Sequence, residues 1–396
     1  MKNGKNVHLE HLEDEIINLG SDGGKKAIRV LREMGRFLSG EKNGTNVTTK
    51  WDGAPAVICG TDPSDGKFFV GTKSVFAKTD PKICKSVEDI QRMYSGALAN
   101  KLIDSFNYLK DCNIKGVLQG DLMFTNDKKT QRIDDEQFVT FRPNTITYAA
   151  KVGTELEKKI SRAKLGIVFH TKYTGPSLPE MQSSFNISDS DYKSTAFTWI
   201  EKAEFQDIGG VAKMTPTERD LYEKAVNRAE GSLKKASKVL DKIQSGKKTL
   251  QIDTEFKKFF NKYVKKGTNI PSVERAYKEF LYHLAGEYDK KIKTLKTLKS
   301  QADKAGKFVD AVVFFEQNEK EVKMLIAAYM NIQVAKNILV DKMKKVSNLR
   351  LFVDMGGGDY KPTTPEGFVA ISGREAVKLI DRLEFARLNF VVPKNW

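Results

Sequence analysis

The chain changes its pattern twice, and this double change limits its fold more than any other feature. Residues 45–210 contain short β-branched and aromatic runs broken by turn residues, which are typical of strands. Residues 211–348 instead contain long segments without proline whose apolar residues recur with helical spacing. Strand-like runs return at 349–396. The sequence therefore predicts an α+β domain, made of 1–210 and 349–396, that is interrupted by an inserted all-α module.

The expected elements follow from these patterns. The first 44 residues are expected to be helical, with Asp22 as a candidate N-cap. Their apolar stripe consists of Ala27, Ile28, Leu31, Met34, Phe37 and Leu38. Strands are predicted over residues 45–51, 55–60, 67–73, 115–124, 137–143, 145–151, 165–173, 349–355 and 367–372. Amphipathic helical segments are predicted over residues 87–111, 217–244, 273–306 and 319–346.

The charge of the chain favours a polyanionic partner. The formal net charge is +16, which suits nucleic acid, nucleotide phosphates or an anionic membrane surface. Residues 211–310 hold 24 Lys and Arg against 13 Asp and Glu, an excess of eleven positive charges. A solvated helix face accounts for part of this excess. Its concentration in one module favours a groove that neutralises phosphates, so the module is predicted to bind nucleic acid.

Several classes of protein are disfavoured. No window approaches the roughly 18 apolar residues of a membrane span, and the N-terminus lacks the apolar core of a signal peptide. Cys59, Cys84 and Cys112 lack CxxC spacing, which fits a reducing cytosol and argues against a zinc ribbon or disulfide framework. A cytoplasmic protein is therefore expected. His8 and His11 form a candidate metal pair, but a solvated N-terminal helix is the preferred interpretation.

The stretch "TTKWDGAPAVIC", residues 48–59, contains the leading candidate for chemistry. Asp52 and Gly53 form either an ordinary turn after a strand or part of a K-x-D-G pattern around Lys50. A neutral lysine amine can attack the α-phosphate of a nucleoside triphosphate. Desolvation, nearby cations or a phosphate-bound metal can lower its pKa from about 10.4. In that interpretation Asp52 orients a ribose hydroxyl, and Gly53 lets the backbone approach the ligand.

Four further residues at strand ends could complete such a site. They are Lys73 in "GTKSVFAK", Asp121 in "VLQGDLMF", Glu366 in "PEGFVAIS" and Lys378 in "AVKLIDRLEF". The lysines would neutralise phosphates, the carboxylates would bind sugar or metal, and Mg²⁺ or Mn²⁺ is expected. Each also has a purely structural interpretation. Asp121 could be a turn residue, Glu366 the partner of a lysine, and Lys378 a surface residue of an amphipathic helix.

In this order the motifs resemble those of the covalent nucleotidyltransferase superfamily, which includes ATP-dependent RNA and DNA ligases and mRNA capping enzymes. The K-x-D-G at 50–53 and "EGFV" at 366–369 match the family well. Lys73, Asp121 and Lys378 match more loosely, as does Phe169 in "GIVFHT". The resemblance covers roughly residues 45–175 and 350–385.

The resemblance implies an ATP-grasp-like adenylation domain of antiparallel sheets flanked by helices, with ATP as substrate and AMP carried on Lys50. It further implies that Phe169 stacks on the base, whereas a core position is the alternative from the residues alone. The residues that it implies for nucleotide binding are Asp52, Gly53, Lys73, Asp121, Phe169, Glu366 and Lys378, with Asp121 and Glu366 also holding the metal.

Two departures from the family refine the prediction. Asp121 stands where the family has Glu, which shortens its reach. The 18 residues after Lys378 leave no room for the C-terminal OB domain of DNA ligases and capping enzymes, which favours an RNA ligase. The alternatives are an ATP-dependent DNA nick ligase and a non-catalytic nucleic-acid-binding protein on a degenerate nucleotidyltransferase scaffold. The sequence predicts no oligomeric state.

Overall fold

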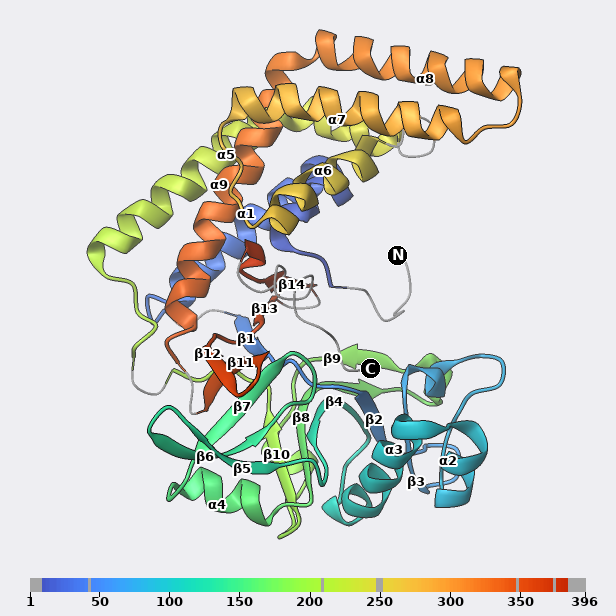
Figure 1. Cartoon of the computed structure of the whole chain (residues 1–396), viewed down its shortest axis with the longest axis vertical. Helices are drawn as coiled ribbons and strands as arrows, with labels where there is room; N and C mark the ends of the chain where they lie inside the picture. Colours follow the sequence, from blue (N-terminus) through green and yellow to red (C-terminus); the bar gives the residue numbers. More distant parts are fainter. Residues whose placement is uncertain are drawn as a thin grey trace.

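The protein consists of a helical body and a body of β-sheets, with a small three-stranded sheet between them (Figure 1). This computed structural model describes residues 9–41, 44–207, 210–246, 252–346, 349–372 and 375–383. Helices and mostly antiparallel sheets occur together, so the protein is of the α+β class, as expected from the sequence.

The largest sheet, here called the central sheet, has the strand order β10–β8–β4–β2–β3, with β9 paired to β8. Its strands are β2 (Ala56–Thr61), β3 (Phe68–Gly71), β4 (Val117–Phe124), β8 (Leu165–Thr174), β9 (Gln182–Ser184) and β10 (Thr198–Lys202). All pairs are antiparallel except β10 with β8. Helices α2 (Val87–Met93) and α3 (Gly96–Leu109) cover one face, where Leu102 of α3 is buried in one cluster with Leu118 and Ile167.

A five-stranded antiparallel sheet packs on the other face of the central sheet. Its order is β12 (Asp359–Pro362), β11 (Arg350–Gly356), β7 (Ile146–Lys151), β6 (Glu136–Phe141) and β5 (Lys129–Ile133). Phe141 and Tyr148 of this sheet share a buried cluster with Met123, Phe124 and Trp199 of the central sheet, and α4 (Glu155–Arg162) closes the cluster. The glycine run at 356–358 forms the β11–β12 turn, with positive φ at all three positions.

The three-stranded sheet, here called the linking sheet, consists of β1 (Thr45–Lys50), β13 (Gly367–Ser372) and β14 (Glu375–Leu379) in antiparallel order. One face is buried in the core of the helical body through Val47, Phe368, Ala370, Val377 and Leu379. Because side chains alternate along a strand, the opposite face carries Thr48, Lys50, Val369 and Lys378.

The helical body contains α1 (Glu15–Phe37), α5 (Pro216–Ser245), α6 (Ile252–Lys266), α7 (Val273–Lys293), α8 (Leu298–Gln317) and α9 (Glu319–Met343). The predicted helical character of the inserted block is confirmed. However, α1 packs against α5 and α9 (Figure 1), with Leu31 and Met34 buried beside Tyr222 of α5. The structure therefore places α1 with the helical block, whereas the sequence grouped it with the sheets.

Two predicted helices are interrupted. The segment 87–111 forms α2 and α3 because the helix stops at Tyr94 and Gly96 has a φ of 62°. The segment 273–306 divides between α7 and α8.

The predicted N-cap of the first helix is also different. Gly20 kinks α1 with a φ of 64°, and the Ser21 N–H after the kink donates to Asp241 Oδ1 of α5 at 2.8 Å. The Asp22 side chain pairs with Lys25 instead.

The predicted solvated environment of the N-terminal histidines is wrong for His11. Its side chain is partly buried between the linking sheet and the helical body, and desolvation is the main cause that lowers its pKa from 6.5 to about 3. His8 lies outside the described residues. Within the described ranges, no helix combines the length and the apolar character that a membrane crossing requires.

Candidate active site

The linking sheet brings the two best-matched motifs together. Lys50, the last residue of β1, lies opposite Gly367, the first residue of β13. Lys50 Nζ donates a hydrogen bond to the carboxylate of Glu366, with the two side chains 28% and 13% exposed. A Cβ on Gly367 would lie 2.6 Å from the carbonyl oxygen of Leu379, so glycine allows β13 to begin against β14. The K-x-D-G and E-G motifs thus form one site.

Lys378 lies on β14, opposite Val369, and not on a helix surface. Alternation places its side chain on the same face of the linking sheet as Lys50. Burial is the main cause that lowers the pKa of Lys378, and the positive charge of Lys50 lowers it further. Two lysines on one half-buried face repel each other, which favours a bound anion between them.

Glu366 has an environment that suits a proton acceptor. Burial raises the pKa of its carboxyl group above the ordinary value, and the charge and hydrogen bond of Lys50 oppose this rise. A carboxylate with a raised pKa accepts a proton more readily than a solvated one. Glu366 is thus the proton-accepting group that contacts Lys50.

Asp52 is buried, and its carboxylate is already occupied. Its oxygens accept hydrogen bonds from the side chain of Asn144 at 2.7 Å and from the backbone N–H groups of Thr145 at 2.7 Å and Ile146 at 2.8 Å. Its own N–H donates to the Tyr148 hydroxyl at 2.7 Å. Burial raises the pKa of Asp52, and the hydrogen bonds to its carboxylate oppose the rise. In the structure Asp52 therefore anchors the turn between β6 and β7, which is a different role from the predicted ribose contact.

Gly53 lies directly against β4. A Cβ at this position would be 2.5 Å from the Asp121 Cβ and 3.0 Å from Met123 Sδ. Contacts this short do not occur between real side chains, so only glycine lets the chain after Lys50 cross β4 here. The predicted close approach exists, but the neighbour is a strand of the protein.

Asp121 projects from the face of the central sheet that is turned away from α3. Its Oδ1 lies 3.8 Å from His170 Nε2 on the neighbouring strand β8. His170 was not predicted. It sits at a bulge where the β4–β8 register shifts, and a single-residue shift along "GIVFHT" would have selected it in place of Phe169.

Phe169 lies on the opposite face from Asp121. It is fully buried under α3, together with Leu118 and Ile167. The predicted stacking of this ring on a base does not fit its position, because the ring is enclosed in the core.

Lys73 is exposed at the start of the short helix η2 (Lys73–Phe76), directly after β3. Gly71, the last residue of β3, pairs with Ile58, and Ala56 pairs with Asp121. The chain that leaves β3 therefore continues towards the level of Asp121 along the strand direction. The fold therefore places Lys73 at about the same level of the central sheet as Asp121, two strands away.

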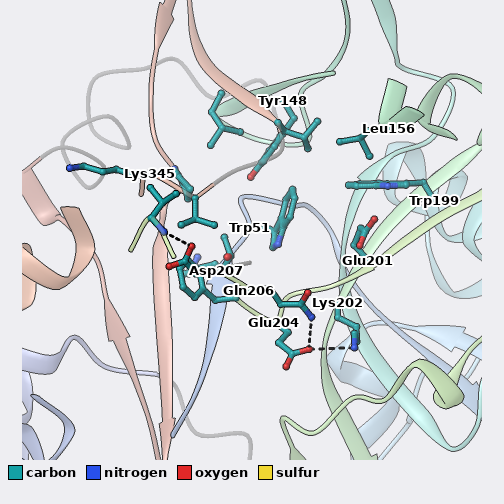
Figure 2. A pocket seen from close by; sticks show the side chains of 18 residues that line it. Trp51, Tyr148, Leu156, Trp199, Glu201, Lys202, Glu204, Gln206, Asp207 and Lys345 are labelled. Atoms are coloured by element: carbon teal, nitrogen blue, oxygen red, sulfur yellow. Dashed lines mark hydrogen bonds and ion pairs between the residues drawn. The ribbon is translucent and has the colours of Figure 1, made fainter. Parts of the chain in front are cut away.

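A cavity of about 430 Å³ lies beside the end of β1 (Figure 2). Trp51 points into it with Tyr148 and Trp199, at ring-centroid distances of 5.3 and 6.1 Å from Trp51. Thr49, Lys50 and Trp51 all line this cavity, as does Pro365 beside Glu366, so the aromatic cavity adjoins the Lys50–Glu366 contact. A smaller cavity of about 220 Å³ is lined by Thr48 and His170 and adjoins the lysine-bearing face.

The carboxylates of the site fit a metal only in part. Within the described residues, no three His, Cys, Asp or Glu side chains gather into a metal-binding group. Mg²⁺ that accompanies a nucleotide commonly uses one or two protein carboxylates, with phosphates and water completing its coordination. Asp121 and Glu366 supply that number of carboxylates.

Comparison with known proteins gives a family but no activity. A family model described as "Family of unknown function (DUF6267)" matches residues 6–394. No curated protein and no solved structure matches the chain.

Proposed function

The chain belongs to this family of unknown function (DUF6267), and we propose from its site that it is an ATP-dependent polynucleotide ligase that acts on RNA. One observation carries the proposal. Lys50 contacts Glu366, and Lys378 lies on the same face of the linking sheet. Three segments that are distant in the sequence thus supply a nucleophile, a proton acceptor and a phosphate-binding cation.

The fold is compatible with this proposal. We assign the central, five-stranded and linking sheets to an adenylation domain of the ATP-grasp-like nucleotidyltransferase type. The support is the antiparallel pairing of nearly all strands and the position of Lys50 where the linking sheet meets the central sheet, near Asp121.

The first step of the proposed reaction forms a lysyl-AMP. Glu366 accepts a proton from the Lys50 ammonium, and the neutral amine attacks the α-phosphorus of ATP. A P–N bond forms, the bond from the α-phosphorus to the bridging oxygen breaks, and pyrophosphate leaves. Lys378 is placed to neutralise the α-phosphate as charge develops on its oxygens.

The later steps return the lysine to its starting state. A 5′-phosphate end attacks the lysyl-AMP, the P–N bond breaks, and Lys50 regains its proton. A 3′-hydroxyl then attacks the adenylated 5′-phosphate, forms the phosphodiester and releases AMP. Mg²⁺ or Mn²⁺ held by Asp121 and Glu366 would neutralise phosphate charge during this chemistry.

Incubation with radiolabelled ATP and Mg²⁺, followed by a denaturing gel, tests the first step. We expect labelled protein from the wild type and none from Lys50→Ala. Lys78→Ala, which removes an exposed lysine outside the site, is the matched control and should label normally. Equal labelling of Lys50→Ala and wild type would overturn the assignment. Mass spectrometry of the labelled protein should show one added AMP on Lys50.

The substrate is tested with nicked duplexes that carry a 5′-phosphate. Sealing of nicked RNA in preference to nicked DNA is expected. Sealing of DNA alone would identify a DNA nick ligase. Binding of nucleic acid without any transfer of AMP would identify a non-catalytic protein.

A further inference from the structure

A third polar cavity, of about 480 Å³, lies between the helical body and the residues that flank β14. Its polar lining comes from three separate parts of the chain. These are Lys258, Asn261, Lys262 and Lys265 of α6, His283 and Glu287 of α7, and His11 and Arg382 beside the linking sheet. This cavity shares no lining residue with the aromatic cavity beside Lys50.

Positive charge dominates this lining. The spacing of Lys258, Lys262 and Lys265 places them on one face of α6, and Arg382 adds a fourth cation. Glu287 is the one acidic residue in the lining. Lys258 is also balanced by Glu255, whose Oε1 is 3.1 Å from Lys258 Nζ. Arg382 pairs with Asp14 at 3.3 Å and Glu13 at 3.7 Å, so the excess of positive charge in the lining comes from the lysines of α6.

One buried cation in the lining, Arg382, has a nitrogen atom without a hydrogen bond in the described part of the chain. The Arg382 side chain is 8% exposed, and its Nη1 contacts Asp14 at 3.3 Å and the Tyr329 hydroxyl at 3.0 Å, but its Nε has no partner among the described residues. The His283 side chain is 2% exposed, but its Nε2 lies 3.5 Å from Glu255 Oε2, so this nitrogen faces a carboxylate and is not open to an anion. A buried donor without a partner is costly, and the oxygens of an anion would satisfy it.

We propose that this cavity binds a phosphate group, and, resting on the proposed ligase function, that the phosphate belongs to the polynucleotide substrate. Its position supports this source. His11 in the cavity wall forms a β-bridge with Lys378, and the Lys378 N–H donates to the Glu10 carbonyl at 2.9 Å. The cavity thus borders the strand that carries Lys378, and a strand of RNA held there passes beside the site of AMP transfer.

The test compares two triple variants that remove equal charge. One variant combines Lys258→Gln, Lys262→Gln and Lys265→Gln. The control combines Lys234→Gln, Lys235→Gln and Lys238→Gln, three exposed lysines on α5. The readouts are fluorescence anisotropy with a labelled single-stranded RNA at several salt concentrations, calorimetric titration with inorganic tripolyphosphate, and the melting temperature.

The α6 variant should bind RNA about tenfold more weakly than the wild type, since it loses three charge contacts. The slope of log affinity against log salt should become shallower by about 2, because each phosphate contact on a single strand contributes roughly 0.7 and three contacts are lost. The control should change much less, and both variants should melt near the wild-type temperature. Loss of tripolyphosphate binding with unchanged RNA binding would assign the cavity to a free polyphosphate.

Equal weakening in both variants, or no weakening of either ligand, would overturn the proposal. If the melting temperature falls only in the α6 variant, its weaker binding could come from loss of stability. The single variant Lys265→Gln then separates the two causes, because it should still weaken RNA binding. Attachment of AMP to Lys50 is measured on the same proteins. It should stay intact in the α6 variant, so failure of the phosphate site and failure of the ligase assignment give different results.

Discussion

Replacing Gly53 by alanine tests whether this glycine serves packing or a ligand. The added Cβ would lie 2.5 Å from the Asp121 Cβ, 3.0 Å from Met123 Sδ and 3.1 Å from the Leu122 carbonyl oxygen. Strand β4 cannot shift easily to relieve these contacts, because it is paired with β2 on one side and β8 on the other. We expect the free energy of unfolding to decrease by about 1–3 kcal/mol, as for other overpacked positions.

Gly231 provides the matched control for this substitution. It lies within α5, and a Cβ there would meet nothing within 4 Å. Gly231→Ala should therefore increase the free energy of unfolding by about 1 kcal/mol, because alanine favours a helix more than glycine does. The same chemical change is thus expected to have opposite effects at the two positions.

Urea unfolding measures both effects. Trp51 and Trp199 lie in or against the cluster between the central and five-stranded sheets, so tryptophan fluorescence reports on the region around Gly53. Far-UV circular dichroism reports on α5. If Gly53→Ala unfolds at the wild-type urea concentration but no longer accepts AMP, the packing argument is refuted, and the glycine is needed for the nucleotide.

Three further outcomes are expected. The wild type should lose roughly 1 kcal/mol of stability per pH unit as the pH falls from 6.5 towards 3, because His11 takes up a proton only when unfolded; His11→Gln should flatten this dependence in urea titrations. Phe169→Leu should cost roughly 1–2 kcal/mol from lost core volume and leave AMP attachment unchanged, whereas weaker ATP binding at unchanged stability would restore the stacking role. Asp52→Ala should cost about 1–3 kcal/mol or more, since it leaves the N–H groups of Thr145 and Ile146 without partners; thermal unfolding at wild-type temperature would contradict this.

The local sequence pattern was sufficient to predict the strands that short runs of residues determine. β1, β4 and β13 were predicted from runs of β-branched and aromatic residues, and the structure confirms them. The two best-matched motifs also located Lys50 and Glu366, which the structure brings into contact. Their contact depends on the pairing of β1 with β13, which the order of the motifs implied through a resemblance and not through any local signal.

The features of the fold and the site that the sequence did not predict depend on contacts between distant segments. The partners of Asp52 lie on the β6–β7 turn, so its anchoring role is invisible in the K-x-D-G motif. The position of His170 depends on a bulge opposite β4, and a bulge reverses the face to which later residues point. The helical pattern of α1 is clear in the sequence, but nothing in that pattern says that its partners are α5 and α9.

One face of the linking sheet packs on the helical body, and the other face carries the candidate site. The position of the site is therefore tied to that of the helical body. Val47, Phe368 and Leu379 seal one face against the helices, while Lys50 and Lys378 occupy the other. A rotation of the helical body would therefore tilt both lysines with it. For the same reason the helical block is not a removable accessory. A chain without residues 211–348 would expose the apolar face of the strands that carry Lys50 and Lys378.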